Sequence, residues 1–232
     1  MSRLAPAPRQ FAQARARATY EALLAAAREV FAERGYDAAQ TPEIAARASV
    51  AVGTLYRYFR DKRQVFIEMI QHHLAQAHDE VAAQLLPERL VSGDRRQIID
   101  VVLHVLFAHV RRHPDLHRVY LAMSLRDEEV AALRVRFEAL GEALIADVLE
   151  ALTTREAVPD PRAAAHVLCV AALEVTLARA GLRGTRRDDL DDDAVRVALR
   201  EMIHRFVFAP AEALAPAPGP GDGPGDVPPR TR

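Results

Sequence analysis

A short stretch of the chain, SVAVGTLYRYFRDK at residues 49–62, carries hydroxyl, phenol, guanidinium and ammonium groups on a predicted helix. With about 100° between successive residues, Ala51, Leu55 and Phe59 share one side of this helix, and Arg57 points the opposite way. Hydrogen-bond donors of these kinds bind phosphate oxygens, and a guanidinium can also pair with O6 and N7 of guanine. The stretch therefore indicates a surface that contacts nucleic acid.

Spacing alone leaves a second interpretation open. Tyrosines at the edge of a helix are commonly half-buried, and an arginine between them is commonly solvated. On these residues alone, a DNA-contacting helix and an edge helix of a generic helical bundle explain the pattern equally well.

The composition is that of a globular protein with an uneven charge. The 232 residues are 50% hydrophobic and 27% charged, with one cysteine. No secretion signal is recognisable, and the longest apolar runs are shorter than a membrane span. Residues 1–70 contain eleven Arg and Lys against seven Asp and Glu, whereas the rest of the chain is acidic. We expect a cytoplasmic protein whose N-terminal third meets any polyanionic partner.

The segments beside the opening stretch predict further short helices. Apolar residues follow the helical period over residues 19–35 and stop at Gly35. Thr41 then supplies a capping hydroxyl for a helix over residues 41–48, and Asp61 caps a fourth helix. A helix, a three-residue turn and a second helix form the helix-turn-helix arrangement, whose second helix can enter a major groove.

The remainder of the chain predicts longer helices and no strand. We expect helices at residues 76–86, 94–112, 115–124, 127–152, 161–181 and 191–208, with proline or glycine between them. The tail at residues 209–232 contains half of the prolines and four of the ten glycines, so we expect it to be disordered.

At this point the sequence resembles a known family. FAERGYDAAQTPEIAARASVAVGTLYRYFRDK is similar to the DNA-binding domain of TetR-family transcriptional regulators, and the likeness covers about residues 19–70. The matching positions are Phe31, Gly35, Tyr36, Ile44, Ala45, Ala48, Val50, Gly53, Thr54, Leu55, Tyr56, Tyr58, Phe59 and Lys62.

The resemblance implies an all-α fold with an N-terminal three-helix helix-turn-helix DNA-binding domain and a C-terminal helical ligand-binding and dimerisation domain. We accordingly expect a flexible basic arm at residues 1–18 and a DNA-binding domain at 19–75. Residues 76–208 would bind a ligand and dimerise, and 209–232 would form the disordered tail.

The resemblance also implies roles for single residues. Tyr56 and Lys62 are expected to hold phosphates, Thr54 and Tyr58 to contact backbone or bases, and Arg57 is the best candidate for reading a base. The whole predicted DNA-binding set is Gln40, Thr41, Val52, Gly53, Thr54, Tyr56, Arg57, Tyr58 and Lys62.

Three positions depart from the family pattern. Ser49 occupies the place of its turn glycine, Ala51 that of its helix-capping serine, and Gln40 that of its capping threonine. Loss of a hydroxyl cap costs about 1 kcal/mol, so we expect the reading helix to fray unless Ser49 caps it from the turn. A phosphate contact at the start of the second helix would move from Gln40 to Thr41.

Two C-terminal helices predict a subunit interface. Val195, Leu199, Met202 and Phe206 recur on one face, with Ile203 and Val207 widening it, and residues 163–177 are apolar nearly all round. By resemblance these helices would form an intersubunit four-helix bundle. A monomer core is the alternative, although a palindromic site requires two reading heads.

Polar groups inside apolar runs mark a candidate effector pocket. Glu174 requires a partner, which could be a cationic ligand but is more simply an Arg or His of the same fold. His109, His113 and His117 have the spacing of metal ligands, but Pro114 breaks the helix between them, so no metal site is expected. The predicted ligand-binding residues are His109, Tyr120, Met123, Phe137, His166, Cys169 and Glu174.

These expectations favour a ligand-responsive repressor that binds a palindromic operator in double-stranded DNA as a homodimer and is released by a small molecule. We expect no cofactor, no membrane partner and no catalytic residues, because no nucleophilic triad, phosphate-binding loop or metal-ligand motif is recognisable. A helical small-molecule-binding protein or an enzyme that does not act through DNA remains the alternative.

Overall fold

A computed structural model describes residues 13–184 and 189–208, in which every regular element is a helix. The expectation of an all-helical fold is therefore confirmed. The predicted tail and residues 1–12 of the predicted arm lie outside the described residues.

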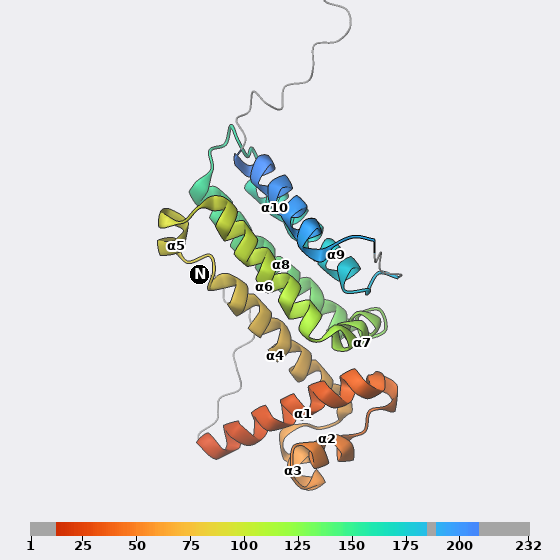
Figure 1. Cartoon of the computed structure of the whole chain (residues 1–232). Helices are drawn as coiled ribbons and strands as arrows, with labels where there is room; N and C mark the ends of the chain where they lie inside the picture. Colours follow the sequence, from red (N-terminus) through yellow and green to blue (C-terminus); the bar gives the residue numbers. More distant parts are fainter. Residues whose placement is uncertain (1–12, 185–188, 209–232) are drawn as a thin grey trace, which may run out of the picture.

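Three helices form the N-terminal unit, with α1 (Ala14–Ala38) lying across α2 (Thr41–Arg47) and α3 (Val52–Tyr58) (Figure 1). Gly35 interrupts α1 with a φ of 73°, so the predicted helix end is a break followed by a last short turn. The ring of Phe31 packs edge-on against that of Phe66, with centroids 5.0 Å apart. This aromatic contact joins α1 to the helix that follows α3.

That helix, α4 (Lys62–Ala82), is continuous. The predicted break between two helices near residue 75 is wrong, because the segment contains neither Gly nor Pro and nothing interrupts its backbone hydrogen bonds. Asp61 caps it as predicted, its carboxylate accepting a hydrogen bond from the Gln64 amide at 2.8 Å. One helix thus passes from the N-terminal unit into the upper bundle (Figure 1), and the proposed domain boundary at 75/76 falls inside it.

The helices from α6 onward complete the upper bundle. The short α5 (Pro87–Ser92), which the sequence pattern did not predict, precedes them. Asp94, Asp127 and Asp160 each accept backbone hydrogen bonds at a helix start. The helix ends agree with the predicted ones to within two residues. The helices are α6 (Arg95–Arg112), α7 (Pro114–Ser124), α8 (Glu128–Leu152), α9 (Pro161–Arg179) and α10 (Asp192–Phe208).

The buried side chains of the described residues form two hydrophobic cores, and the first crosses the predicted domain boundary. It joins the buried side chains of α1–α4 to Leu116 and Tyr120 of α7 and to Val130 and Leu133 of α8. The second core lies among α6, α8, α9 and α10. The N-terminal unit is therefore packed directly on one end of the bundle.

The apolar stripe predicted on α10 divides into two parts. Leu199, Ile203 and Val207 are buried in the second core, whereas Met202 and Phe206 are 50% and 45% exposed. The core of one subunit therefore explains the three buried residues of the stripe, the two exposed residues are free for a subunit interface, and Val195 is intermediate.

The apolar helix α9 also has an exposed side, where Val167 and Val170 are 57% and 44% exposed. By length and hydropathy α9 could cross a membrane, but core helices of globular proteins have the same properties. Here Ala164, Ala165 and Leu168 are buried in the second core. The unpartnered apolar side is what a subunit interface requires.

Candidate nucleic-acid interface

The second helix of the helix-turn-helix pair, α3, presents one face to the core and the other to solvent. Leu55 and the following Phe59 are buried, while Tyr56 and Arg57 are exposed. Val52, Gly53 and Gln40 are exposed as well, and Thr54 and Tyr58 are half-buried at the margins. The predicted division of this helix into two faces is therefore correct for residues 52–59.

Ala51 was expected on the inner face and is instead exposed. Its backbone is extended, with φ −66° and ψ 147°, so the helical step of 100° does not reach it. As the N-cap residue it offers no side-chain hydrogen bond, and Ser49 does not replace it. The start of α3 is uncapped, as the departure from the family pattern predicted.

The turn before α3 contains backbone strain. Ser49 has a φ of 57°, the conformation that glycine adopts most easily. Backbone hydrogen bonds from the Ser49 amide to Ala46 and from the Val50 amide to Ala45 hold this turn, both at 3.0 Å. The turn before α3 therefore keeps the left-handed backbone conformation typical of glycine, although serine occupies the position.

Tyr56 and Thr41 tie the two helices of the motif together. Their hydroxyl oxygens lie 2.8 Å apart, and Thr41 is buried. The prediction that Thr41 caps α2 is wrong, since the N-cap position is Gln40 and the Thr41 hydroxyl is turned toward Tyr56. Their hydrogen bond fixes the phenol of Tyr56 at the edge of the exposed face.

The side chain of Lys62 binds backbone carbonyl groups of the same protein. Its ammonium donates hydrogen bonds to the carbonyl oxygens of Tyr36, Asp37 and Ala39 at 2.9, 3.0 and 3.0 Å. These carbonyls belong to the end of α1, where helical partners run out. Because all three N–H groups are engaged, Lys62 has no donor left for a phosphate in this conformation.

Arg57, on the outer face of α3, differs from the neighbouring arginines. It is exposed, and among the described residues its guanidinium has no ion-pair or hydrogen-bond partner. By contrast, Arg47 binds Glu33 and Arg60 binds Asp61, so neighbouring guanidinium groups are already paired. The geometry therefore leaves Arg57 available for a ligand of this surface.

The predicted effector residues do not form a single site. His109, Tyr120 and Met123 are buried around α6 and α7, and Phe137 packs against the first core. The other three, His166, Cys169 and Glu174, lie on α9.

On α9, His166 is exposed and its Nδ1 lies 2.8 Å from a Glu142 carboxylate oxygen. Glu174 pairs with Arg183, so the simpler of its two predicted partners, an Arg of the same fold, is present. Burial raises the pKa of the Cys169 thiol to about 12, which fits a packing residue and not a reactive thiolate.

A hollow of about 400 Å³ lies instead between α1 and α4. Its walls include Arg28, Met69 and His73, and none of the seven predicted ligand residues. His73 was not singled out from the sequence, although it falls within the predicted buried stripe of α4. A polar residue inside such a stripe was the signal that could have identified it.

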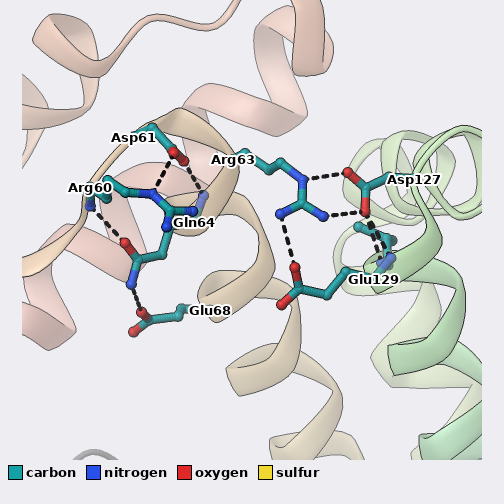
Figure 2. A network of polar contacts seen from close by, with 8 residues as sticks. Arg60, Asp61, Arg63, Gln64, Glu68, Asp127 and Glu129 are labelled. Atoms are coloured by element: carbon teal, nitrogen blue, oxygen red, sulfur yellow. Dashed lines mark hydrogen bonds and ion pairs between the residues drawn. The ribbon is translucent and has the colours of Figure 1, made fainter.

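Ion pairs of two arginines, Arg63 and Arg126, connect the N-terminal unit to the bundle. Arg63 at the start of α4 donates to both carboxylate oxygens of Asp127 at 2.6 and 2.9 Å, and to Glu129 at 2.9 Å (Figure 2). Arg126 binds Asp37 at 2.9 and 3.2 Å. The Arg63 guanidinium holds the pKa of Asp127 below its usual range. These contacts make the position of the N-terminal unit depend on the junction between α7 and α8.

Comparison with known proteins agrees with this geometry. Residues 23–69 match the family described as "Bacterial regulatory proteins, tetR family". The HTH-type transcriptional activator FasR of Mycolicibacterium smegmatis is 27% identical over 169 residues, 73% of this chain and 74% of that protein. The fatty acid metabolism regulator protein of Bacillus subtilis is 40% identical over 60 residues, but these are 26% of this chain and 31% of that relative.

Solved structures show that the fold extends beyond the matched segment. A protein described as a TetR-family transcriptional regulator from Mesorhizobium loti superposes with a TM-score of 0.67 over 84% of this chain and 97% of its own, at 19% identity. At this identity the likeness concerns the fold alone.

Replacing Ser49 by glycine should raise the free energy of unfolding by about 0.5–1 kcal/mol, because the left-handed conformation costs L-residues about 1–2 kcal/mol and glycine loses more chain entropy on folding. Chemical denaturation measures the change. The matched control, Ala22→Gly at an exposed position of α1, should lower stability by about 0.5–1 kcal/mol. Equal destabilisation by both would contradict the strain assigned to Ser49.

Replacing Arg63 by glutamine should cost about 1 kcal/mol at pH 7, since a bidentate ion pair is lost while the Asp127 cap remains. The pKa of Asp127 is lower in the folded state, so the pair contributes above the unfolded pKa of about 3.9 and is lost as pH falls through the folded value. Urea titrations at pH 7 and in strong acid should show the difference from wild type shrinking.

The control for that comparison is Arg118→Gln, which removes an exposed pair with Asp115 on a single helix. It should change stability by less than about 0.5 kcal/mol at either pH. An Arg63 variant that behaves like this control would show that the junction contributes nothing.

Proposed function

Residues 23–69 make this chain a member of the TetR family of bacterial regulatory proteins, and from this premise we propose a DNA-binding transcriptional regulator that responds to a small molecule. The observation that carries the proposal is the exposed, unpaired Arg57 on a recognition helix whose other face is locked into the core. An enzyme would need a group of reactive side chains. We propose that this chain has no catalytic residues.

The DNA-contacting face would comprise the outer side of α3 and the start of α2. In this proposal Arg57 reads a base, while Gln40, Val52, Gly53, Thr54, Tyr56 and Tyr58 contact the backbone or base edges. Thr41 and Lys62 act indirectly, since Thr41 orients Tyr56 and Lys62 closes the end of α1. Direct phosphate contact by Lys62 would require it to release a carbonyl.

We propose that the protein acts as a homodimer through α9 and α10. Met202 and Phe206 on α10 and Val167 and Val170 on α9 are large apolar side chains left exposed after the second core has formed. A second copy covers such faces and supplies the second head that a palindrome requires, with half-sites about 34–36 Å apart.

The regulatory effect we propose is repression. A bound dimer occupies the major groove and excludes other proteins from the same DNA, which requires no additional contact. The M. smegmatis relative is named an activator, so transcription from the regulated promoter has to decide the direction of the effect. The match to the B. subtilis regulator spans only 60 residues and transfers no effector to this chain.

Effector control would act through the junction between the N-terminal unit and the bundle. A ligand that displaces α4 against α7 and α8 would move α1–α3 as well, because Lys62 and the shared core hold them to α4. The same displacement would disturb the ion pairs of Arg63 and Arg126 at the α7–α8 junction. The separation of the two heads then changes, and affinity for a fixed operator spacing falls.

Arg57→Ala should relax sequence preference at one base pair of each half-site by about 1–3 kcal/mol while leaving α3 folded. Binding to a randomised operator library measures this change. Arg34→Ala, which removes an exposed arginine already paired with Glu43, is the control and should leave the preference unchanged. Identical preference profiles for wild type and the Arg57 variant would rule out base reading.

Phe206→Glu combined with Met202→Glu should convert the dimer to a monomer, because two charges would be buried at the interface. Sedimentation velocity reports the assembly state. Leu125→Glu, at a side chain that is 85% exposed between α7 and α8, is the control and should leave the dimer intact. A double variant that sediments like wild type would exclude this interface.

A further inference from the structure

Three histidines converge in the interior where α4 meets α6 and α7. His73, His109 and His117 are 4%, 5% and 7% exposed. The Nε2 atom of His73 lies 3.1 Å from that of His109 and 3.4 Å from that of His117. The ligating atoms of all three side chains lie within 4.8 Å of one another.

Hydrogen bonds among the rings cannot satisfy these nitrogens. Each imidazole nitrogen offers either one hydrogen or one lone pair, directed in the ring plane. The Nε2 atom of His73 can therefore make one full hydrogen bond, yet two nitrogens approach it. The buried Nδ1 of His109 also has no hydrogen-bond partner among the described residues. Such a cluster has binding capacity that the protein itself does not use.

The spacing is close to that of ligands around a single metal ion. Zinc–nitrogen bonds of about 2.0–2.1 Å place two tetrahedral ligands about 3.3–3.4 Å apart. Two ligands of one ion cannot be more than about 4.2 Å apart, so the widest pair in the cluster must close slightly. We propose that His73, His109 and His117 bind a divalent transition-metal ion of the zinc class, for which imidazole is a preferred ligand.

The surroundings fit a site of this kind. Burial lowers the pKa of His117 to about 4 and that of His73 to about 2, so both rings are neutral at pH 7 and have a lone pair to donate. A Glu80 carboxylate oxygen lies 3.9 Å from Nδ1 of His109, where it can orient the ring once Nε2 is occupied.

Charged side chains of both signs lie near the histidine cluster. Glu80 offsets part of the positive charge that Arg28 and Arg112 contribute to the cluster. The ring of His113 lies near that of His73, with centroids 5.7 Å apart, and borders the site. His73 also lines the hollow between α1 and α4, so solvent and a further ligand can approach from that side.

The fold also explains why the sequence argued against metal. Pro114 does end α6, but the chain turns at His113 and begins α7 immediately, which places His117 beside His109. The third ligand comes from α4, far away in the sequence. The expectation of no metal rested on Pro114 breaking the helix between His109 and His117, and it left His73 out.

A metal at this position would couple to DNA binding, and this consequence rests on the proposed function. The ion would join α4, which carries the N-terminal unit, to α6 and α7. Occupied and empty states would then hold α4 differently, so we expect metal to change operator affinity by about 5-fold or more.

Titration of chelator-treated full-length protein with Co²⁺ and Zn²⁺ tests the site directly. Wild type should bind one ion per chain, and Co²⁺ should develop the visible absorption of a four- or five-coordinate complex with nitrogen ligands. His109→Gln and His117→Gln should each weaken binding by more than about 100-fold, since even outer-shell changes cost 10–100-fold. Circular dichroism confirms that each variant is folded.

His104→Gln is the matched control, because His104 lies on α6 like His109 but is exposed. It should bind both metals as wild type does. Absence of stoichiometric binding by wild type would overturn the proposal whether or not the variants fold. Equal weakening by His104→Gln would overturn it too, because the bound ion would then lie elsewhere.

Operator binding with and without Zn²⁺ separates the two proposals. Wild type should change its affinity for the operator on adding Zn²⁺, and His109→Gln should not. Metal binding with unchanged operator affinity would overturn the coupling and leave a structural site. Metal binding by a protein that binds no operator in either state would overturn the proposed function and support the site.

Discussion

The ammonium of Lys62 holds together the part of the molecule on which the rest depends. It donates hydrogen bonds to three carbonyl oxygens at the end of α1. There Gly35 has broken the helix, and the last carbonyls have no helical N–H group to accept from. Lys62 is also the first residue of α4. One side chain therefore fixes the start of α4 against the end of α1 and closes the segment that contains α2 and α3. It is the single lysine of the chain.

Beyond Lys62, α4 connects the N-terminal unit to the bundle. Arg63 follows Lys62 directly and binds Asp127, which itself caps α8. The first core then continues from α4 into α7 and α8, so no separate hydrophobic core isolates the N-terminal unit. Because α4 has no break along its length, a displacement in the bundle is passed to α1–α3 and not absorbed at a hinge. His73, one member of the histidine cluster, lies on the same helix, about one turn beyond Ile70.

The recognition helix is held by packing more than by its own ends. It has only seven residues, it lacks a side-chain cap, and the preceding turn keeps Ser49 in a left-handed conformation. Leu55 and Phe59 in the core and the hydroxyl contact of Tyr56 with Thr41 compensate for these local costs. A helix of this length is not stable alone, so its shape depends on the helices beneath it.

The sequence by itself determined the helical fold, most helix ends, and the two faces of α3 from Val52 to Phe59. These features follow from local rules: proline and glycine positions, aspartate caps and the helical period. It could not determine which groups Thr41 and Lys62 bind, since their partners lie on other helices or at an earlier turn.

Nor could the sequence show that Glu174 pairs with Arg183 or that His73 joins His109 and His117. A hydrogen bond or a buried cluster depends on which side chains meet across helices, and helical periodicity contains no information about that encounter. The helix α4 shows the same division between what the sequence and the tertiary structure determine. Its length follows from the absence of a breaker, but its role as the connection between the reading head and the bundle is decided only by what packs against each of its ends.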